Sequence, residues 1–104
     1  MLRIYTFVLE VIQRMGPVLK AIGRHDADLA RQCRRALTSV ALNCEEGRNR
    51  RGGNGRLRFE TAMGSANEVR ACIEVAVALG YIEAQPELVD ALDRIARTLH
   101  RLMK

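Results

Sequence analysis

Two stretches of the sequence carry polar side chains at helical spacing, and these residues have the clearest chemical potential. In the first stretch Ser39 and Asn43 are four residues apart, and Glu46 follows within the next turn. In the second, Ser65 and Glu68 are three residues apart and share one flank. Buried amides and carboxylates require hydrogen-bond partners, so the pattern predicts a polar network that holds two helices in register or lines a subunit seam. The alternative is a binding or catalytic pair of carboxylates, Glu46 and Glu68.

Other catalytic and metal-binding chemistries lack the residues that they need. Neither His25 nor His100 follows a glutamate by three positions, so the Glu-x-x-His pairs of a di-iron bundle are missing. No two cysteines or histidines have the spacing of zinc ligands. The glycine-rich segment 52–55 is not followed by the Lys-Ser/Thr of a phosphate-binding loop. We therefore expect no metal, no cofactor, no catalytic residue and no enzymatic activity.

Three cysteines, Cys33, Cys44 and Cys72, fall at helical positions among apolar residues. Their odd number and wide spacing are typical of small hydrophobic side chains in a reducing cytoplasm rather than of a disulfide framework. No apolar run reaches the roughly 20 residues that span a bilayer, and charges interrupt the N-terminal apolar pattern, which excludes a signal peptide. These features predict a cytoplasmic protein with no membrane partner.

The basic residues are the strongest compositional signal. The formal net charge is +5, the pI is about 9.7, and 15 of the 17 basic residues are arginine. The planar guanidinium binds phosphate through two donors, which favours nucleic acid or an acidic protein as partner; a GC-rich genome that favours arginine is the alternative. Two Tyr, two Phe and no Trp offer few rings to stack on bases, which argues against sequence-specific reading. The candidate phosphate contacts are Arg31, Arg34, Arg35, Arg48, Arg50, Arg51, Arg56 and Arg58.

Four helices must position these groups, and apolar periodicity predicts them at about residues 2–22, 27–46, 56–79 and 86–103. Pro17 predicts a kink in the first helix. Asp26 or Asp28 is placed to cap the second helix, and Gly47 to follow its last turn. Residues 47–55 contain only Gly, Arg and Asn, which predicts a flexible basic loop.

The whole chain, residues 1–104, is long enough for one domain with one core. Short links make neighbouring helices antiparallel, so we predict an all-α, antiparallel up-and-down four-helix bundle. Residues 71–80 are apolar almost all round, which is typical of a helix buried on more than one side. In so small a bundle we expect the second side to meet another subunit. The candidate interface residues are Leu42, Cys72, Val75 and Leu79.

The polar stretches resemble the four helix bundle protein family, which includes proteins encoded in intervening sequences of bacterial large-subunit ribosomal RNA genes. The accessory protein of diversity-generating retroelements is a relative. The family pattern resembles R-A-x-x-S-V-x-x-N-I-A-E-G, a basic variable loop, A-x-G-S-x-x-E and a closing L-G-Y. The matching residues are Arg35, Ala36, Ser39, Val40, Asn43, Glu46, Gly47, Ala62, Gly64, Ser65, Glu68, Leu79, Gly80 and Tyr81. Cys44 and Glu45 depart from the pattern, where Ile and Ala are usual, and the added charge of Glu45 is expected to weaken anion binding there.

The resemblance implies a ring-like homo-oligomer, usually a pentamer, with a basic surface and a role in binding nucleic acid. It also implies that the motif residues form a structural network: Ser39, Asn43, Glu46, Gly47, Gly64, Ser65 and Glu68. The leading hypothesis is thus a non-enzymatic, oligomeric module that binds RNA or DNA through phosphates. The alternative is a protein–protein adaptor or structural scaffold. An enzyme would require the carboxylates of Glu46 and Glu68 to converge in one cleft.

Overall fold

The computed structural model describes residues 3–49 and 53–104, and four α-helices make up most of that part of the chain. They are α1 (Arg3–His25), α2 (Ala27–Asn49), α3 (Gly53–Ala78) and α4 (Pro86–Leu102). The described residues contain no strand. The predicted all-α class is confirmed, as is the order of four helices.

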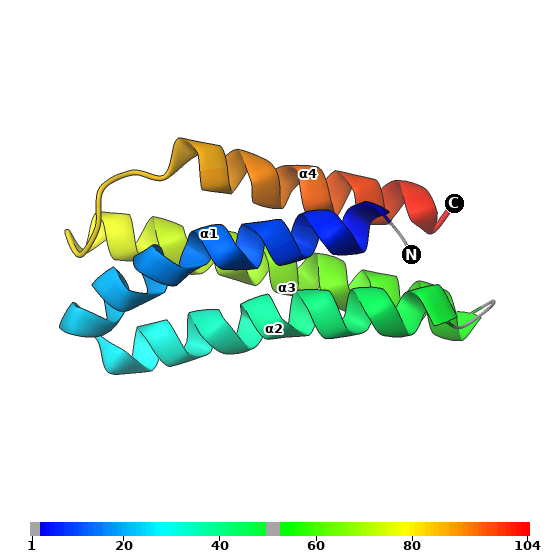
Figure 1. Ribbon diagram of the computed structural model, residues 1–104, viewed down its shortest axis with the longest axis horizontal. Coiled ribbons are helices and arrows are strands. Elements are labelled where there is room, and N and C mark those ends of the chain that lie inside the picture. Colours follow the sequence, from blue (N-terminus) through cyan, green and yellow to red (C-terminus); the bar gives the residue numbers. More distant parts are fainter. Residues whose placement is uncertain (1–2, 50–52) are drawn as a thin grey trace.

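The helices form an antiparallel bundle that measures 42 × 22 × 20 Å (Figure 1). Helix α1 packs against α2 and α4, and α3 packs against the same two neighbours. Both chain termini lie at the end of the bundle where α2 stops and α3 begins. We call this the terminal end, and we call the opposite end, where α1 meets α2 and α3 meets α4, the far end. None of the described helices combines the length and hydropathy that crossing a membrane requires.

Aliphatic side chains fill the core. In α1 the buried residues recur every three or four positions from Ile4 to Ile22, as the periodicity predicted. Helix α3 contributes small side chains, including Ala62, Ala66 and Ala76, which are almost fully buried. Small residues allow helix backbones to approach closely, so the composition of α3 favours tight packing against its neighbours.

The first connection is shorter than predicted. Helix α1 continues through His25, so Asp26 alone links it to α2. The backbone N–H of Leu29 donates to Asp26 Oδ1 at 2.9 Å, which makes Asp26 the residue that caps α2. Pro17 lies inside α1, and Figure 1 shows the helix bending in its last turns toward the start of α2. A proline cannot donate to the carbonyl one turn back, which accounts for the bend.

The predicted loop at 47–55 is the largest error in the helix boundaries. Residues 47–49 are the last turn of α2 and residues 53–55 begin α3, while residues 50–52 lie outside the described residues. Gly47 therefore does not end α2. Gly47 and Gly55 are buried where the two helices meet, and this packing compensates for the low helix propensity of glycine.

The end of α3 follows its sequence closely. Gly80 has φ +76°, a conformation that glycine adopts without strain. The N–H of Gly80 donates to Val77 O at 3.0 Å, and the N–H of Tyr81 donates to Ala76 O at 2.9 Å, which together form a Schellman motif. The ring of Tyr81 then stacks on His25, with centroids 5.0 Å apart. The Leu-Gly-Tyr triplet thus stops α3 and ties it to α1.

Candidate functional site

A hydroxyl–amide network joins α2 to α3 at the middle of the bundle. The Oγ atoms of Ser39 and Ser65 are 2.8 Å apart. Asn43 Nδ2 donates to both the carbonyl oxygen and the Oγ of Ser39, each at 3.0 Å. At the outer edge, Arg58 donates to Asn43 Oδ1 at 3.4 Å. The structure brings Ser39, Asn43 and Ser65 together as the spacing predicted, and these three are uncharged groups suited to fixing helix register rather than to proton transfer.

The two motif carboxylates are not brought together. Gln32 Nε2 lies 3.5 Å from Glu68 Oε2, which places Glu68 beside the first half of α2. Glu46 is exposed near the other end of α2, 14 residues beyond Gln32, a rise of about 21 Å along the helix. The interpretation of Glu46 and Glu68 as a catalytic pair in one cleft is therefore wrong.

The two motif glycines make no side-chain hydrogen bond, and what distinguishes each is the space left by its missing Cβ atom. A Cβ atom on Gly47 would lie 2.7 Å from Cδ1 and Cε1 of Phe59, so only glycine lets this ring pack against the α2 backbone. Gly64 is exposed, and a Cβ atom there would have nothing within 4 Å. Neither glycine supplies a side chain to the hydroxyl–amide network, and Gly64 faces outward.

The cysteines are core residues. Cys33, Cys44 and Cys72 are free and buried. Burial raises the pKa of the Cys33 thiol to about 12, with further contributions from the nearby Cys72 and a hydrogen bond to it. Burial likewise raises the pKa of Cys44 to about 11 and that of Cys72 above its ordinary value. Neutral, buried thiols are poor nucleophiles, which fits a packing role.

Three of the four predicted interface residues are exposed. Leu42, Val75 and Leu79 expose 62%, 46% and 56% of their surface. Cys72 exposes only 4%, so within one subunit its side chain belongs to the core. It lies seven residues after Ser65, so it occupies the same α2-facing side of α3 and points into the bundle.

The predicted arginines on the first half of α2 lie among carboxylates. Arg31 donates to Asp28 Oδ1 at 2.9 Å. Arg31 and Arg35 also line a groove together with Asp28, Gln32 and Glu68. Arg34 is exposed and has no ion-pair partner among the described residues. This cluster is therefore of mixed charge, which the sequence spacing alone did not indicate.

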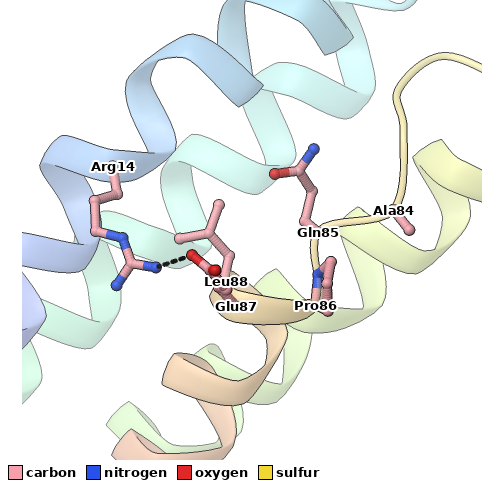
Figure 2. Close-up of a pocket in the computed structure, with 6 residues that line it drawn as sticks. All are labelled: Arg14, Ala84, Gln85, Pro86, Glu87 and Leu88. Carbon is pink, nitrogen blue, oxygen red and sulfur yellow. Dashed lines mark ion pairs between the residues drawn. The ribbon is translucent and has the colours of Figure 1, made fainter.

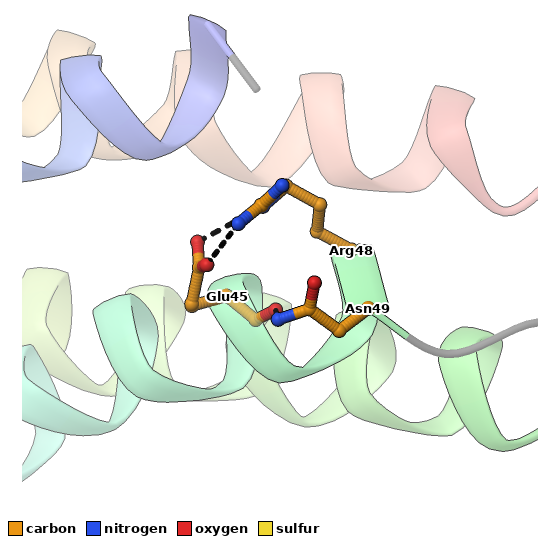
Figure 3. Close-up of polar contacts among 3 residues, drawn as sticks. All are labelled: Glu45, Arg48 and Asn49. Carbon is orange, nitrogen blue, oxygen red and sulfur yellow. Dashed lines mark hydrogen bonds and ion pairs between the residues drawn. The ribbon is translucent and has the colours of Figure 1, made fainter. Parts of the chain in front are cut away.

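At the terminal end, Arg48 turns back along its own helix. Its guanidinium binds the carboxylate of Glu45, while Asn49 Nδ2 donates to Glu45 O at 3.2 Å (Figure 3). The hydrogen bond from Arg48 is the main reason that the pKa of Glu45 is lowered, and the same bond raises the pKa of Arg48. The charge of Glu45 is thus neutralised within α2. Arg56 and Arg58 are exposed on the first turns of α3, whereas Arg50 and Arg51 lie outside the described residues.

The described residues give little support for a metal site or for a catalytic pocket. The described residues contain no group of three or more His, Cys, Asp or Glu side chains that could hold a metal ion. An open pocket at the far end is lined by Arg14 and by the start of α4 (Figure 2). There Arg14 reaches from α1 toward Glu87, with 4.0 Å between Nη2 and Oε2. This pocket presents a compensated charge rather than a set of convergent catalytic groups.

Comparison with known proteins decides the family. Residues 3–103 match the model of the 23S rRNA-intervening sequence protein family. The chain belongs to this family. A crystal structure of a protein of unknown function from the S23 ribosomal protein family of Bacteroides thetaiotaomicron VPI-5482 has the same fold, with a TM-score of 0.88. The two are 19% identical, and the alignment covers 97% of this chain and 98% of the other. No curated protein matches the chain significantly.

Several of the residues that carried the resemblance have structural roles in this chain. Ser39, Asn43 and Ser65 join α2 to α3, Gly47 admits Phe59, and Gly80 ends α3. Family recognition therefore rests on residues that build the bundle. Residues that bind a ligand must be sought elsewhere on its surface.

Sequence reasoning did not assign one surface of this family member. Arg97, His100 and Arg101 of α4 line a groove with Ala96 and with Met63 of α3. The available signal was the helical spacing of Arg97 and Arg101, four residues apart in a segment without carboxylates. Their proximity to an apolar residue of another helix could not be read from that spacing.

Proposed function

We propose that this chain is a non-catalytic, oligomeric bundle that binds RNA or DNA through phosphate contacts. The observation that carries the proposal is the set of exposed arginines that have no ion-pair partner among the described residues, which includes Arg56, Arg97 and Arg101. Exposed guanidinium groups on a chain of net charge +5 attract polyanions, and each phosphate that they neutralise releases counterions.

Assembly with copies of itself is supported by exposed apolar residues on the outside of α3, on a side that Glu68 shares. Leu57, Gly64, Val75 and Leu79 are exposed and separated by seven, eleven and four residues, which are whole numbers of helical turns. Leu42 on α2 is exposed one turn after Ser39, beside the same seam. Glycine inside a helix costs about 1 kcal/mol relative to alanine, and Gly64 gains nothing within one subunit. Close approach of a second copy would explain both features.

A symmetric ring, with the pentamer as the expected stoichiometry, would repeat the basic surface around an axis. Repetition raises the overall affinity without requiring strong contacts in each subunit. The three neutral, buried thiols fit a reducing compartment, the cytoplasm. A non-catalytic role is consistent with the separation of Glu46 from Glu68 and with the inert thiols.

The proposal is tested by measuring mass and binding on the same preparation. Light scattering should give a mass of several subunits, and fluorescence anisotropy at low salt should show binding to labelled RNA or DNA. The logarithm of the affinity should fall linearly with the logarithm of the salt concentration. Absence of binding to single-stranded and duplex RNA and DNA at low salt would rule out the proposed function.

A protein adaptor is the second candidate, favoured by the exposed leucines at Leu42, Leu57 and Leu79. An acidic protein partner would use the same arginines as a phosphate backbone would. A defined protein that co-purifies with the chain, together with no affinity for nucleic acid at low salt, would decide for the adaptor.

A further inference from the structure

Helices α3 and α4 place their cations at the same end of the bundle. Residues 95–104 of the chain include Arg97, Arg101 and Lys104 and no carboxylate. The antiparallel α3 begins at this terminal end with Arg56 and Arg58 (Figure 1). Among the acidic side chains of these two helices, Glu68, Glu74, Glu87, Asp90 and Asp93 lie toward the middle or the far end, whereas Glu60 lies near the terminal end, two residues after Arg58.

Helix stability explains the order of the charges along α4 but not along α3. Carboxylates near the start of α4 and cations near its end suit the helix macrodipole. In α3 the order is reversed, since its first turn contains no acidic residue and its last turn no basic one. Arg56 and Arg58 near the positive N-terminus of α3 are unfavourable for that helix. Arg58 donates to Asn43 Oδ1 of α2 at 3.4 Å, whereas Arg56 has no ion-pair partner among the described residues and keeps its donors for an anionic ligand.

The groove between α3 and α4 at this end combines cations with an apolar floor. Met63 and Ala96 are partly buried in it, while Arg97, His100 and Arg101 are exposed at its rim. Arg97 makes no hydrogen bond or ion pair with the described residues. Arg101 reaches only the hydroxyl of Thr98, at 3.4 Å. Both guanidinium groups therefore keep most of their donors available to a ligand.

The cationic surface continues past the groove to the tip of the bundle. Arg56 and Lys104 line an adjoining hollow with Gly55, Phe59 and Met103. By contrast, the groove beside Arg31 and Arg35 includes the carboxylates of Asp28 and Glu68, which would repel a phosphate. The α3–α4 seam at the terminal end thus has the higher complementarity to a polyanion.

We propose that this groove binds single-stranded nucleic acid, with phosphates on Arg97 and Arg101 and an unstacked base over Met63 and Ala96. The inference rests on the proposed function and specifies its site and ligand. An apolar floor between cations fits a strand whose bases are exposed, because a duplex keeps its bases paired and stacked inside. Contact through phosphates and an apolar base face makes the groove tolerant of sequence.

The experiment compares two charge-matched variants, R97Q/R101Q in the groove and R34Q/R35Q on α2, by fluorescence anisotropy. All four arginines are exposed, so both variants are expected to fold, which circular dichroism checks. The probes are labelled oligo(U), oligo(dT) and a mixed-sequence duplex of about 20 nucleotides, longer than one binding site. The R97Q/R101Q variant is expected to bind both single strands at least about tenfold more weakly, because it loses two charge-assisted contacts.

The salt dependence provides an independent readout. Each lost phosphate contact reduces the magnitude of the slope of log affinity against log salt by about 0.7 for a single strand. For R97Q/R101Q, which loses two contacts, the slope should therefore be smaller in magnitude by about 1.4 for each strand segment bound. R34Q/R35Q should change the slope by less than half of this. Met63→Gln should weaken binding of single strands while leaving the slope unchanged, because it removes apolar contact and no charge.

The outcomes distinguish a failure of the proposed site or ligand from a failure of the proposed function. If R34Q/R35Q weakens binding as much as R97Q/R101Q does, the site is elsewhere and only the general function survives. If the duplex binds as tightly as either single strand, the choice of ligand is wrong. If the unaltered protein binds none of the probes, the proposed function itself fails. A difference between oligo(U) and oligo(dT) would identify RNA or DNA as the preferred strand.

Discussion

Helix α3 has two neighbours and meets them by different means. Toward α2 it presents small residues and a serine hydroxyl, and a glycine of α2 lets the ring of Phe59 approach the backbone. Toward α4 it presents Arg70, which donates to Asp93 Oδ1 at 2.8 Å, and beyond this pair the seam opens into the basic groove. After these distinguishing contacts we call the α2–α3 seam shape-specified and the α3–α4 seam charge-specified, while buried aliphatic side chains pack along both.

This difference shows how one helix can serve two purposes. A seam that is closed by shape complementarity holds the register of the bundle and leaves few polar atoms for a ligand. A seam with cations at its rim leaves guanidinium donors for phosphate. The exposed apolar residues of α3 lie on its outer side, beside the α2 seam, so assembly and ligand binding would use separate surfaces.

Gly47→Val is the substitution that we expect to destabilise the shape-specified α2–α3 seam most. A Cβ atom at this position would overlap the ring of Phe59 at 2.7 Å, and overpacking of this kind costs about 1–3 kcal/mol. Unfolding in urea at fixed protein concentration, followed by circular dichroism, should therefore show a loss of about 2 kcal/mol. Gly23→Ala is the control, because a Cβ atom there would lie 3.6 Å from Ala30 Cβ, an ordinary contact, so stability should be unchanged or rise by up to about 1 kcal/mol. Equal effects at the two glycines would refute the close approach of α2 and α3.

The next effect concerns assembly. Leu42→Asp places a charge on the exposed side of the α2–α3 seam, where Leu42 makes little contact within its own subunit. If a second copy covers this position, association should weaken by at least about tenfold, or 1.4 kcal/mol. Light scattering over a dilution series measures the change. Leu9→Asp on α1 is the control, since Leu9 is also exposed but lies on another helix. An unchanged mass for Leu42→Asp at every concentration would place the interface elsewhere.

The hydroxyl contact across the same seam should contribute less. Ser65→Ala removes the partner of Ser39 Oγ and is expected to cost about 1 kcal/mol. Because Ser39 and Ser65 share one bond, the Ser39→Ala/Ser65→Ala variant should lose less than the sum of the two single losses. Thr61→Ala is the control, because its hydroxyl only binds Leu57 O of its own helix. Strict additivity in this cycle would show that the contact contributes nothing.

The charge-specified seam should respond to salt, and the hydroxyl contact should not. Asp93→Asn removes the charge that faces Arg70, and both side chains are about one third exposed. Partial exposure limits the expected loss to about 0.5 kcal/mol. That loss should shrink when salt is raised toward 1 M, where the Debye length falls to about 3 Å. A loss at Asp93 that is independent of salt, like the loss at Ser65, would remove the distinction between the two seams.

Much of the fold follows from local patterns in the sequence, whereas the surfaces depend on how helices are rotated against each other. Periodicity indicates which residues share a face, and it correctly grouped Ser39 with Asn43. Glycine and the residues that follow it define the end of α3 at Gly80. The same local rules failed at Gly47, because its neighbour Phe59 belongs to another helix.

The candidate site was harder to predict for the same reason. The spacing of Arg31 and Arg35 suggested a phosphate surface, but Glu68 of α3 lies in the same groove. Conversely, the apolar floor of the groove beside Arg97 includes Met63, which lies on α3 and is distant from Arg97 in sequence. A pattern within one helix describes only half of any seam, so the charge and polarity of a groove require both helices to be placed.

The smallest expected effect concerns an ion pair within α2, Glu45 with Arg48, which does not cross the α2–α3 seam. The hydrogen bond from Arg48 lowers the pKa of Glu45 in the folded chain from its ordinary value of 4.5. The pair therefore adds stability at and above about pH 4.5, and that contribution is lost as the pH falls through the lower folded value. Glu45→Gln should reduce the Tm slightly at pH 7, and the difference should shrink as the pH falls below about 4.5 and Glu45 becomes protonated. Glu74→Gln, at an exposed carboxylate with no ion-pair partner among the described residues, is the control. Since Glu45 and Arg48 belong to one helix, they stabilise α2 itself rather than its contact with α3. A large loss of Tm in Glu45→Gln at pH 7 would contradict this local role, because a partly exposed ion pair within one helix contributes little to stability.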